Sequence, residues 1–200
     1  MVQDLLHSVD THIRVVLLRH SLDSGGIDGD VVRELTGTGI DEAEKCADFL
    51  KQRQFAQLYS SDHLRAKQTL GIINLTLNMS VTISRKLREV SPFYAMGDIE
   101  LMKEKGEPVK DFFKALIKNS EENSLILAVT HSHLIRYILS LRSIKDDSLE
   151  PRSISELYEN ALVSKIGSIV EVQNSSLNVI DISENGLITP RLVNYAEHLT

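Results

Sequence analysis

The sequence has one cysteine and no long run of apolar residues. Because Cys46 has no second thiol to pair with, an internal disulfide is excluded, and a reducing compartment is the natural interpretation. No segment approaches the roughly 18 apolar residues of a membrane-spanning helix. The amino terminus carries Asp4, His7 and Asp10 and lacks the basic and apolar stretches of a signal peptide. We therefore expect a cytoplasmic protein that does not contact a membrane.

Positive charge is also in short supply. The chain has 22 lysines and arginines against 28 acidic residues, a net charge of −6. Because a general nucleic-acid binder is normally basic, we expect no nucleic-acid partner, although a local basic pocket remains possible. His7, His12 and His63 lack metal-ligand spacing, and His131 and His133 have no supporting carboxylates or cysteines. We therefore expect neither a metal nor another cofactor.

Two apolar runs end abruptly in polar residues. Val15–Leu18 is followed by Arg19 and His20, and Leu125–Thr130 runs directly into His131. Open α/β sheets place their chemistry just beyond the carboxyl ends of their strands. The pattern therefore predicts two imidazoles close together at one edge of a sheet.

Strand and helix patterns alternate along the chain. The expected strands are Ile13–Leu18, Phe55–Tyr59, Val81–Ile83, Leu125–Thr130, Ile169–Val172 and Leu177–Ile182, the last two as a hairpin or as neighbours. The expected helices are Thr38–Arg53, one capped by Ser61 or Asp62, Pro108–Lys118, His133–Leu141 and one around Ile154–Ala161. The alternation predicts a single domain over residues 1–200, a three-layer α/β/α sandwich with a mainly parallel central sheet. A short cap region is expected at about 90–120.

The polar residues at the strand ends suit phosphate chemistry. Arg19 and Arg65 can form a positive pocket, because a planar guanidinium donates two parallel hydrogen bonds to a phosphate. A neutral His20 or His131 can attack phosphorus and carry the phosphoryl group, and nearby arginines disfavour its protonation. Glu89 can protonate the leaving oxygen if its pKa is raised. Each residue alone also has an ordinary explanation as a loop contact, a helix cap or a solvated charge, so the prediction rests on their conjunction.

Ordered motifs of this chain resemble the histidine phosphatase superfamily, whose best known branch is the cofactor-dependent phosphoglycerate mutases. The resemblance covers about Ile13 to Leu199. The motifs are Leu18-Arg19-His20, Leu35–Ala43, Tyr59–Thr69, Leu87-Arg88-Glu89 and Ala128–Arg136. The resemblance implies a phosphoglycerate mutase-like fold.

The resemblance also implies a role for each site residue. His20 becomes the phosphorylated nucleophile and Glu89 the proton donor. The phosphate pocket comprises Arg19, Arg65 and His131, and Ser132 adds a hydroxyl or a backbone N–H. Independently of the resemblance, Asp23 and Glu107 are alternative proton donors, because they lie in expected loops that can reach the same edge.

The chain departs from the family pattern at three positions. Ser21 and Ser132 stand where the family usually has glycine, which is compatible with activity if the backbone there is not at positive φ. Gly26 replaces an asparagine that contributes to phosphate binding in many members, which leaves that role to Ser21, Ser24 or a backbone donor. These departures motivate an alternative function, a non-catalytic or weakly active phosphate-binding or interaction module.

The segment between Glu89 and His131 is short compared with that of the glycolytic mutases. A short cap favours a site that admits water, and hence net hydrolysis. We therefore expect a phosphatase that acts on a small phosphorylated metabolite through a phosphohistidine. A phosphoprotein phosphatase is an alternative, and a phosphoglycerate mutase is a weaker one. The sequence does not fix the oligomeric state.

Overall fold

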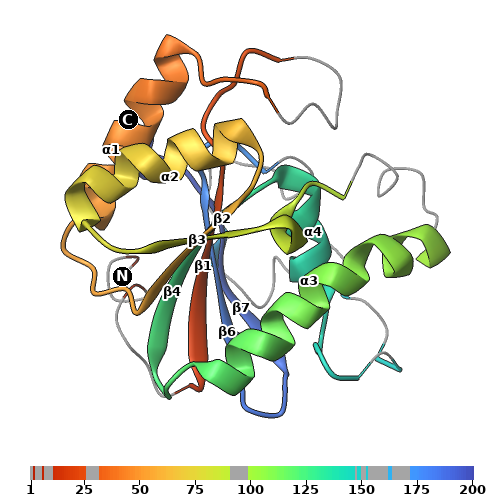
Figure 1. Ribbon diagram of the computed structural model, residues 1–200. Helices are drawn as coiled ribbons and strands as arrows, with labels where there is room; N and C mark the ends of the chain where they lie inside the picture. Colours follow the sequence, from red (N-terminus) through yellow and green to blue (C-terminus); the bar gives the residue numbers. More distant parts are fainter. Residues whose placement is uncertain are drawn as a thin grey trace.

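The computed structural model describes residues 2, 6, 11–25, 32–90, 99–146, 148–149, 152, 162–163 and 172–200. Within them a seven-stranded sheet has the order β3-β2-β4-β1-β6-β7-β5 (Figure 1). The strands are β1 (Ile13–Arg19), β2 (Gln57–Ser61), β3 (Val81–Ser84), β4 (Ser124–Thr130), β5 (Leu162–Val163), β6 (Leu177–Ile182) and β7 (Ile188–Tyr195). Only β6 runs antiparallel to its neighbours among the described pairings, so the sheet is mainly parallel as predicted.

Helices cover both faces of the sheet (Figure 1). They are α1 (Gly37–Leu50), α2 (Leu64–Leu77), α3 (Ile99–Asn119) and α4 (Ser132–Ser140), with short 3₁₀ helices η2 (Arg85–Leu87) and η4 (Glu197–Leu199). Alternate residues of β1 enter two separate cores: Val15 and Leu17 pack in the core that includes α3 and α4 residues, and Val16 and Leu18 in the core with α1 and α2 residues. The predicted three-layer sandwich is therefore confirmed.

The parallel connections bring three strand ends to one edge. Arg19 at the end of β1 lies opposite Thr130 at the end of β4, and Ser60 of β2 lies opposite Val129 of β4. The backbone N–H of His20 donates to the Thr130 carbonyl at 2.9 Å. Residues that follow β1, β2 and β4 therefore meet, as the sequence predicts.

Helix α1 begins against the loop that follows β1. The Thr36 hydroxyl caps it by accepting the Gly39 backbone N–H at 3.0 Å. A Cβ at position 39 would lie 2.0 Å from the Leu22 carbonyl oxygen, so only glycine allows this approach. The glycine thereby holds the start of α1 close to the segment after His20.

The predicted helix at Pro108–Lys118 is too short. Helix α3 begins at Ile99 and continues through Pro108. Proline lacks a backbone N–H and is favoured in the first turn, which is why the sequence placed the helix start there. Upstream packing overrides this preference: Gly106 lies so close to the Tyr137 ring of α4 that a Cβ would come within 2.1 Å of it.

Other boundaries also need correction. Strand β2 is shifted to Gln57–Ser61, α1 ends at Leu50, and the residue before α2 is His63, which makes no side-chain capping bond. Strand β7 was not predicted because Pro190 and the charged Arg191 interrupt its apolar pattern; it pairs antiparallel with β6.

Several expectations fall outside the described residues. They are the helix at 154–161, most of the strand at 169–172, Gly26, and the start of the cap at 91–98. The single-domain organisation with a short cap stays a prediction. No helix within the described part of the chain is long and apolar enough to cross a membrane.

Candidate active site

His20 follows β1 and is 4% exposed. Its Nδ1 lies 2.8 Å from the Ser21 carbonyl oxygen, which can only accept a hydrogen bond, so Nδ1 carries the proton. The lone pair of the neutral ring is therefore on Nε2. Burial, opposed by the Ser21 bond and helped by the charges of Arg65, Arg19 and Arg33, lowers the His20 pKa to about 3. The ring is thus neutral at physiological pH, as phosphoryl transfer to nitrogen requires.

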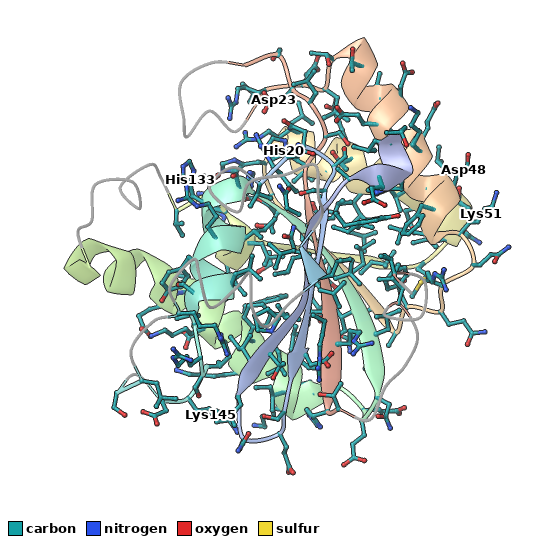
Figure 2. The ribbon with its side chains drawn as sticks, turned by 180° about the vertical axis from the view of Figure 1, so that it is seen from behind. His20, Asp23, Asp48, Lys51, His133 and Lys145 are labelled. Carbon is teal, nitrogen blue, oxygen red and sulfur yellow. The ribbon has the colours of Figure 1, made fainter. Side chains whose placement is uncertain are left out.

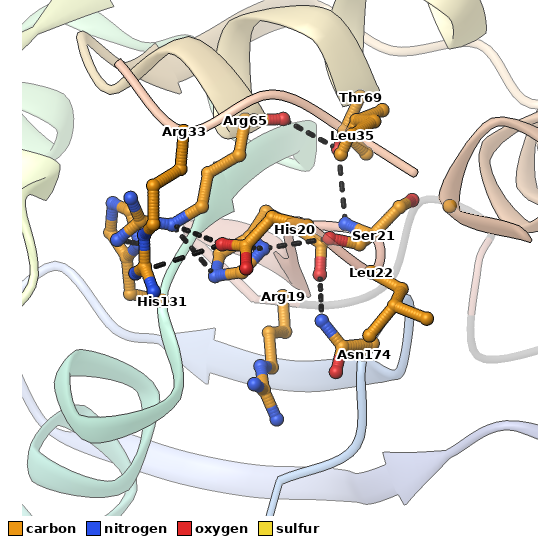
Figure 3. Close-up of polar contacts among 12 residues, drawn as sticks. Arg19, His20, Ser21, Leu22, Arg33, Leu35, Arg65, Thr69, His131 and Asn174 are labelled. Carbon is orange, nitrogen blue, oxygen red and sulfur yellow. Dashed lines mark hydrogen bonds and ion pairs between the residues drawn. The ribbon is translucent and has the colours of Figure 1, made fainter. Parts of the chain in front are cut away.

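Arg65 joins the two predicted imidazoles. Its side chain extends from the first turn of α2 and is almost completely buried. Nε donates to His20 Nε2 at 3.1 Å, and Nη2 donates to His131 Nδ1 at 3.1 Å (Figure 3). The rings of His20 and His131 lie edge to face with centroids 5.2 Å apart. The structure thus brings these three residues together.

His131 is fixed in one tautomer by its partners. Since Arg65 donates to Nδ1, the proton is on Nε2, which lies 2.9 Å from the Ser61 hydroxyl at the end of β2. Burial, followed by the charges of His20 and Arg65, lowers the His131 pKa well below its ordinary value. His63, which the sequence considered only as a metal ligand, packs against His131 with ring centroids 4.8 Å apart.

The segment that begins at His20 is held by polar contacts from helix α2 and from the residues just before β6. The Ser21 backbone N–H donates to the Thr69 hydroxyl of α2 at 3.0 Å, and the Ser21 and Ser175 hydroxyls lie 2.6 Å apart. Asn174 donates to the His20 carbonyl at 3.1 Å. Neither Ser21 nor Ser132 is at positive φ. The condition under which serine can replace glycine at these positions is therefore met.

Arg19 does not join Arg65 above His20. Its guanidinium donates to the Val172 carbonyl, and Figure 3 shows it directed away from Arg65. It still contributes to the lining of the pocket. The Arg65 guanidinium therefore lies beside His20 and the Arg19 guanidinium does not, and the binding of one phosphate by both arginines stays a prediction.

Arg33 is one of the pocket residues that were not predicted from the sequence. It lines the same pocket, and its Nη2 lies 3.6 Å from Asp23 Oδ2. The same Asp23 oxygen lies 3.2 Å from Arg65 Nε and 4.0 Å from His20 Nδ1. The available signal was a single arginine within an acidic, glycine-rich loop, which is weak without knowing that Asp23 and Leu35 pair across that loop.

Glu89 lines the pocket and caps helix α4. Its oxygens accept the backbone N–H groups of His133 at 3.2 Å and Leu134 at 3.0 Å, and His133 Nδ1 lies 3.3 Å from Oε2. Burial alone would raise the Glu89 pKa, but the side-chain bond and charge of His133 and these backbone bonds outweigh it, so the pKa is lowered. Glu89 therefore does not have the raised pKa that was predicted for a proton donor.

The pocket has a volume of about 360 Å³. Its charged lining residues include four arginines and two carboxylates, together with Ser132 at the start of α4: Arg19, Arg33, Arg65, Arg136, Asp23 and Glu89. The excess of positive charge in an acidic protein matches the local basic pocket that the sequence allowed. Glu107 lies on α3, paired with Lys110 at 2.9 Å, and is not among the pocket residues. Among the described residues, no three histidine, cysteine or acidic side chains are grouped as metal ligands would be.

Comparison with known proteins finds a family model that covers less than half of the chain. The family model described as "Histidine phosphatase superfamily (branch 1)" matches residues 15–105, a range that contains His20, Arg33, Arg65 and Glu89. No curated protein matches the chain. The family model and the structural matches that follow confirm the resemblance to the histidine phosphatase superfamily.

Three solved structures illustrate the shared fold. The protein histidine phosphatase SixA, complexed with tungstate, is 22% identical with a TM-score of 0.59, and the match covers 89% of this chain and 94% of that one. A phosphoserine phosphatase from Entamoeba histolytica is 21% identical with a TM-score of 0.65, covering 94% and 100%. A mycobacterial glucosyl-3-phosphoglycerate phosphatase is 15% identical with a TM-score of 0.65, covering 92% and 99%. At these identities the likeness establishes the phosphoglycerate mutase-like fold.

Proposed function

We propose that this protein is a phosphatase that hydrolyses small phosphomonoesters through a phosphohistidine on His20. The observation that carries the proposal is the bridge from Arg65 to two neutral imidazoles. Because Nδ1–H is bound to the Ser21 carbonyl, the lone pair of His20 is on Nε2, where it accepts the Arg65 Nε–H; it becomes available to phosphorus when Arg65 donates to the phosphoryl oxygens instead. A guanidinium at the same place can hold the phosphoryl oxygens beside that lone pair.

In the first step, His20 Nε2 attacks the phosphorus of the bound ester. An N–P bond forms, the P–O bond to the organic group breaks, and the leaving oxygen takes a proton from Glu89. Arg65 is positioned to stabilise negative charge on the transferred group in this pocket. In the second step, water attacks phosphorus while the Glu89 carboxylate accepts its proton. The N–P bond breaks, which releases inorganic phosphate and regenerates neutral His20.

Glu89 must gain a proton before the first step. Its pKa is lowered by its contacts with α4. A phosphate dianion bound in the same pocket adds negative charge nearby, which favours protonation of a carboxylate. We infer that substrate binding raises the pKa of Glu89, so that Glu89 becomes protonated and can act as the proton donor.

The size and charge of the pocket support a small phosphorylated metabolite as substrate. Its volume of about 360 Å³ is at the lower end of the range for small-molecule sites. The compared proteins are named as a protein histidine phosphatase, a phosphoserine phosphatase and a glucosyl-3-phosphoglycerate phosphatase. Phosphoproteins are the alternative substrate class. We propose net hydrolysis rather than mutase activity because the segment between Glu89 and His131 is short.

One observation favours a second candidate, a phosphate-binding module with little turnover. Arg19 donates to the Val172 carbonyl, so one of the two expected phosphate arginines is engaged elsewhere. Substrate-driven rotation of Arg19 would be needed for it to contact a phosphate bound beside His20. Turnover decides between the two functions.

The test uses hydrolysis of an aryl phosphate by the wild type and by His20→Ala. Hydrolysis that His20→Ala abolishes supports the enzyme. His12→Ala, at the opposite end of β1, is the matched control and should retain the wild-type rate. Binding of inorganic phosphate without hydrolysis by the wild type would support the binding module instead.

A reducing cytoplasm is our proposal for its location. Cys46 is buried in α1 as a free thiol, and burial is the main cause that raises its pKa to about 12. A buried thiol with a raised pKa is unreactive, so Cys46 has a structural role. The expected absence of a nucleic-acid partner stays a prediction from net charge.

A further inference from the structure

The Asp23 carboxylate lies between two guanidinium groups inside the pocket. Its Oδ2 is 3.2 Å from Arg65 Nε and 3.6 Å from Arg33 Nη2. The side chain is only 10% exposed, and the same oxygen is 4.0 Å from the His20 ring. A carboxylate oxygen therefore sits on the arginine that the proposed function assigns to the phosphate.

Backbone pairing holds Asp23 and Arg33 on facing sides of one loop. The Ser24 backbone N–H donates to the Glu34 carbonyl at 2.9 Å, and the Thr36 N–H donates to the Leu22 carbonyl at 3.0 Å. Asp23 Oδ1 accepts the Gly25 N–H at 3.0 Å, which orients the carboxylate. The ion pair between Asp23 and Arg33 is thus supported by the backbone around both residues.

A phosphate bound beside His20 would need donors that Asp23 now engages. Arg65 Nε is shared between His20 Nε2 at 3.1 Å and Asp23 Oδ2 at 3.2 Å. Phosphate oxygens and a carboxylate oxygen are acceptors of the same kind for a guanidinium. At such distances two anions also repel each other, so both cannot retain the same partners without cost.

We propose that Arg33 is a further phosphate-binding residue and that Asp23 is an internal anion that competes with the substrate phosphate for Arg33 and Arg65. The inference rests on the proposed phosphate-binding role of this pocket. In the unbound pocket Asp23 is the acceptor for both guanidiniums, and a bound phosphate replaces it. Arg33 thereby supplies a donor that the replacement of asparagine by Gly26 removed from the family pattern.

The competition has a consequence for ligand affinity. An internal anion lowers the affinity for every oxyanion, including the phosphate product, because its pairing must be given up first. Removing the negative charge should therefore tighten binding. If Asp23 only holds the arginines in position, removing its charge should weaken binding instead.

The experiment is calorimetric titration of the full chain with sodium tungstate, an oxyanion that is not turned over. Asp23→Asn should tighten tungstate binding by roughly tenfold, because both guanidiniums lose a competing charge. Arg33→Gln should weaken binding by roughly tenfold, because one charged donor is lost. In the Arg33→Gln background, adding Asp23→Asn should increase tungstate affinity by less than it does in the wild type, since Arg65 is then the only one of the two arginines that Asp23 still engages.

Matched controls come from an ion pair on α1. Asp48 and Lys51 are paired at 3.2 Å, and Figure 2 shows both away from His20 and Asp23. Asp48→Asn and Lys51→Gln change the net charge by the same amounts and should leave tungstate affinity within about twofold of wild type. Asp23→Ser is a second variant that removes the same charge, and melting curves of all variants establish that they fold.

Unchanged or weaker tungstate binding by folded Asp23→Asn or Asp23→Ser would overturn the internal competitor. Unchanged binding by Arg33→Gln would overturn Arg33 as a ligand. These outcomes are separable from the proposed function. Hydrolysis that depends on His20 without these affinity changes defeats only the inference, whereas these affinity changes without hydrolysis defeat only the phosphatase proposal.

Discussion

The Glu89 carboxylate accepts the backbone N–H of Leu134 at 3.0 Å, which ties the segment after η2 to the first turn of α4. A negative charge at a helix N-terminus is stabilised by the helix dipole. The same contact fixes the carboxylate beside the pocket. Glu89 therefore has a structural position and a proposed chemical role, and kinetics can separate the two.

Glu89→Gln should slow substrates with poor leaving groups and largely spare those with very acidic leaving groups. The amide keeps an oxygen for the helix N–H groups but cannot donate a carboxyl proton. The measurement is a leaving-group series of aryl and alkyl phosphates on both proteins. A uniform loss across the series would mean that Glu89 positions the substrate, and no loss would move the proton donor elsewhere, with Asp23 the other carboxyl group in the pocket.

Arg65→Ala should lower kcat/KM. The loss should correspond to about 2.7–4 kcal/mol of transition-state stabilisation, which is the cost of losing one preorganised donor. Arg19→Ala should cost less, because the Arg19 guanidinium is bound to the Val172 carbonyl. Inhibition by vanadate should weaken more in Arg65→Ala than in Arg19→Ala. Equal losses in the two variants would mean that Arg19 reorients fully onto the phosphate.

Stability should fall as the pH drops below about 6.5, the ordinary pKa of histidine. The folded-state pKa of His20 is lowered to about 3 and that of His198 to about 4, in both cases mainly by burial. The unfolded chain therefore binds more protons across this window, so protonation favours unfolding. Thermal melting from pH 8 to pH 4 measures this. His20→Gln should show a smaller acid dependence, and an identical dependence would contradict the lowered pKa.

Gly39→Ala should destabilise the protein by about 1–3 kcal/mol or more, as overpacking does. The new methyl group would meet the Leu22 carbonyl oxygen 2.0 Å away. Gly71→Ala in α2 is the control, because its Cβ meets nothing within 4 Å and alanine is the better helix former. In urea denaturation, the free energy of unfolding should be lower than that of the wild type for Gly39→Ala and higher for Gly71→Ala. A neutral Gly39→Ala would mean that the loop after His20 can move away freely.

The sequence was sufficient to predict the parallel core and the two histidines. Val15–Leu18 and Leu125–Val129 are apolar throughout, and in a parallel sheet their ends must lie at one edge. The Arg65 position followed from the helix after β2. These features depend on local pattern and on connection rules, which sequence carries well.

Contacts across the sheet edge could not be predicted in the same way. The placement of Arg33 depends on the pairing of Asp23 with Leu35, and the direction of Arg19 depends on the distant Val172 carbonyl. The lowered pKa of Glu89 depends on N–H groups of α4 that lie far along the chain. Such properties depend on residues that are close in space but far apart in the sequence, and a local sequence pattern does not identify them.

The most direct test of the central claim is detection of the phosphorylated enzyme. Labelled substrate is mixed with the protein, quenched rapidly without acid, and the labelled residue is identified after proteolysis. The account predicts acid-labile, base-stable label on His20 that is absent from His20→Ala and turns over at a rate no slower than hydrolysis. Hydrolysis at the normal rate with no label on His20, or with full activity in His20→Ala, would contradict it.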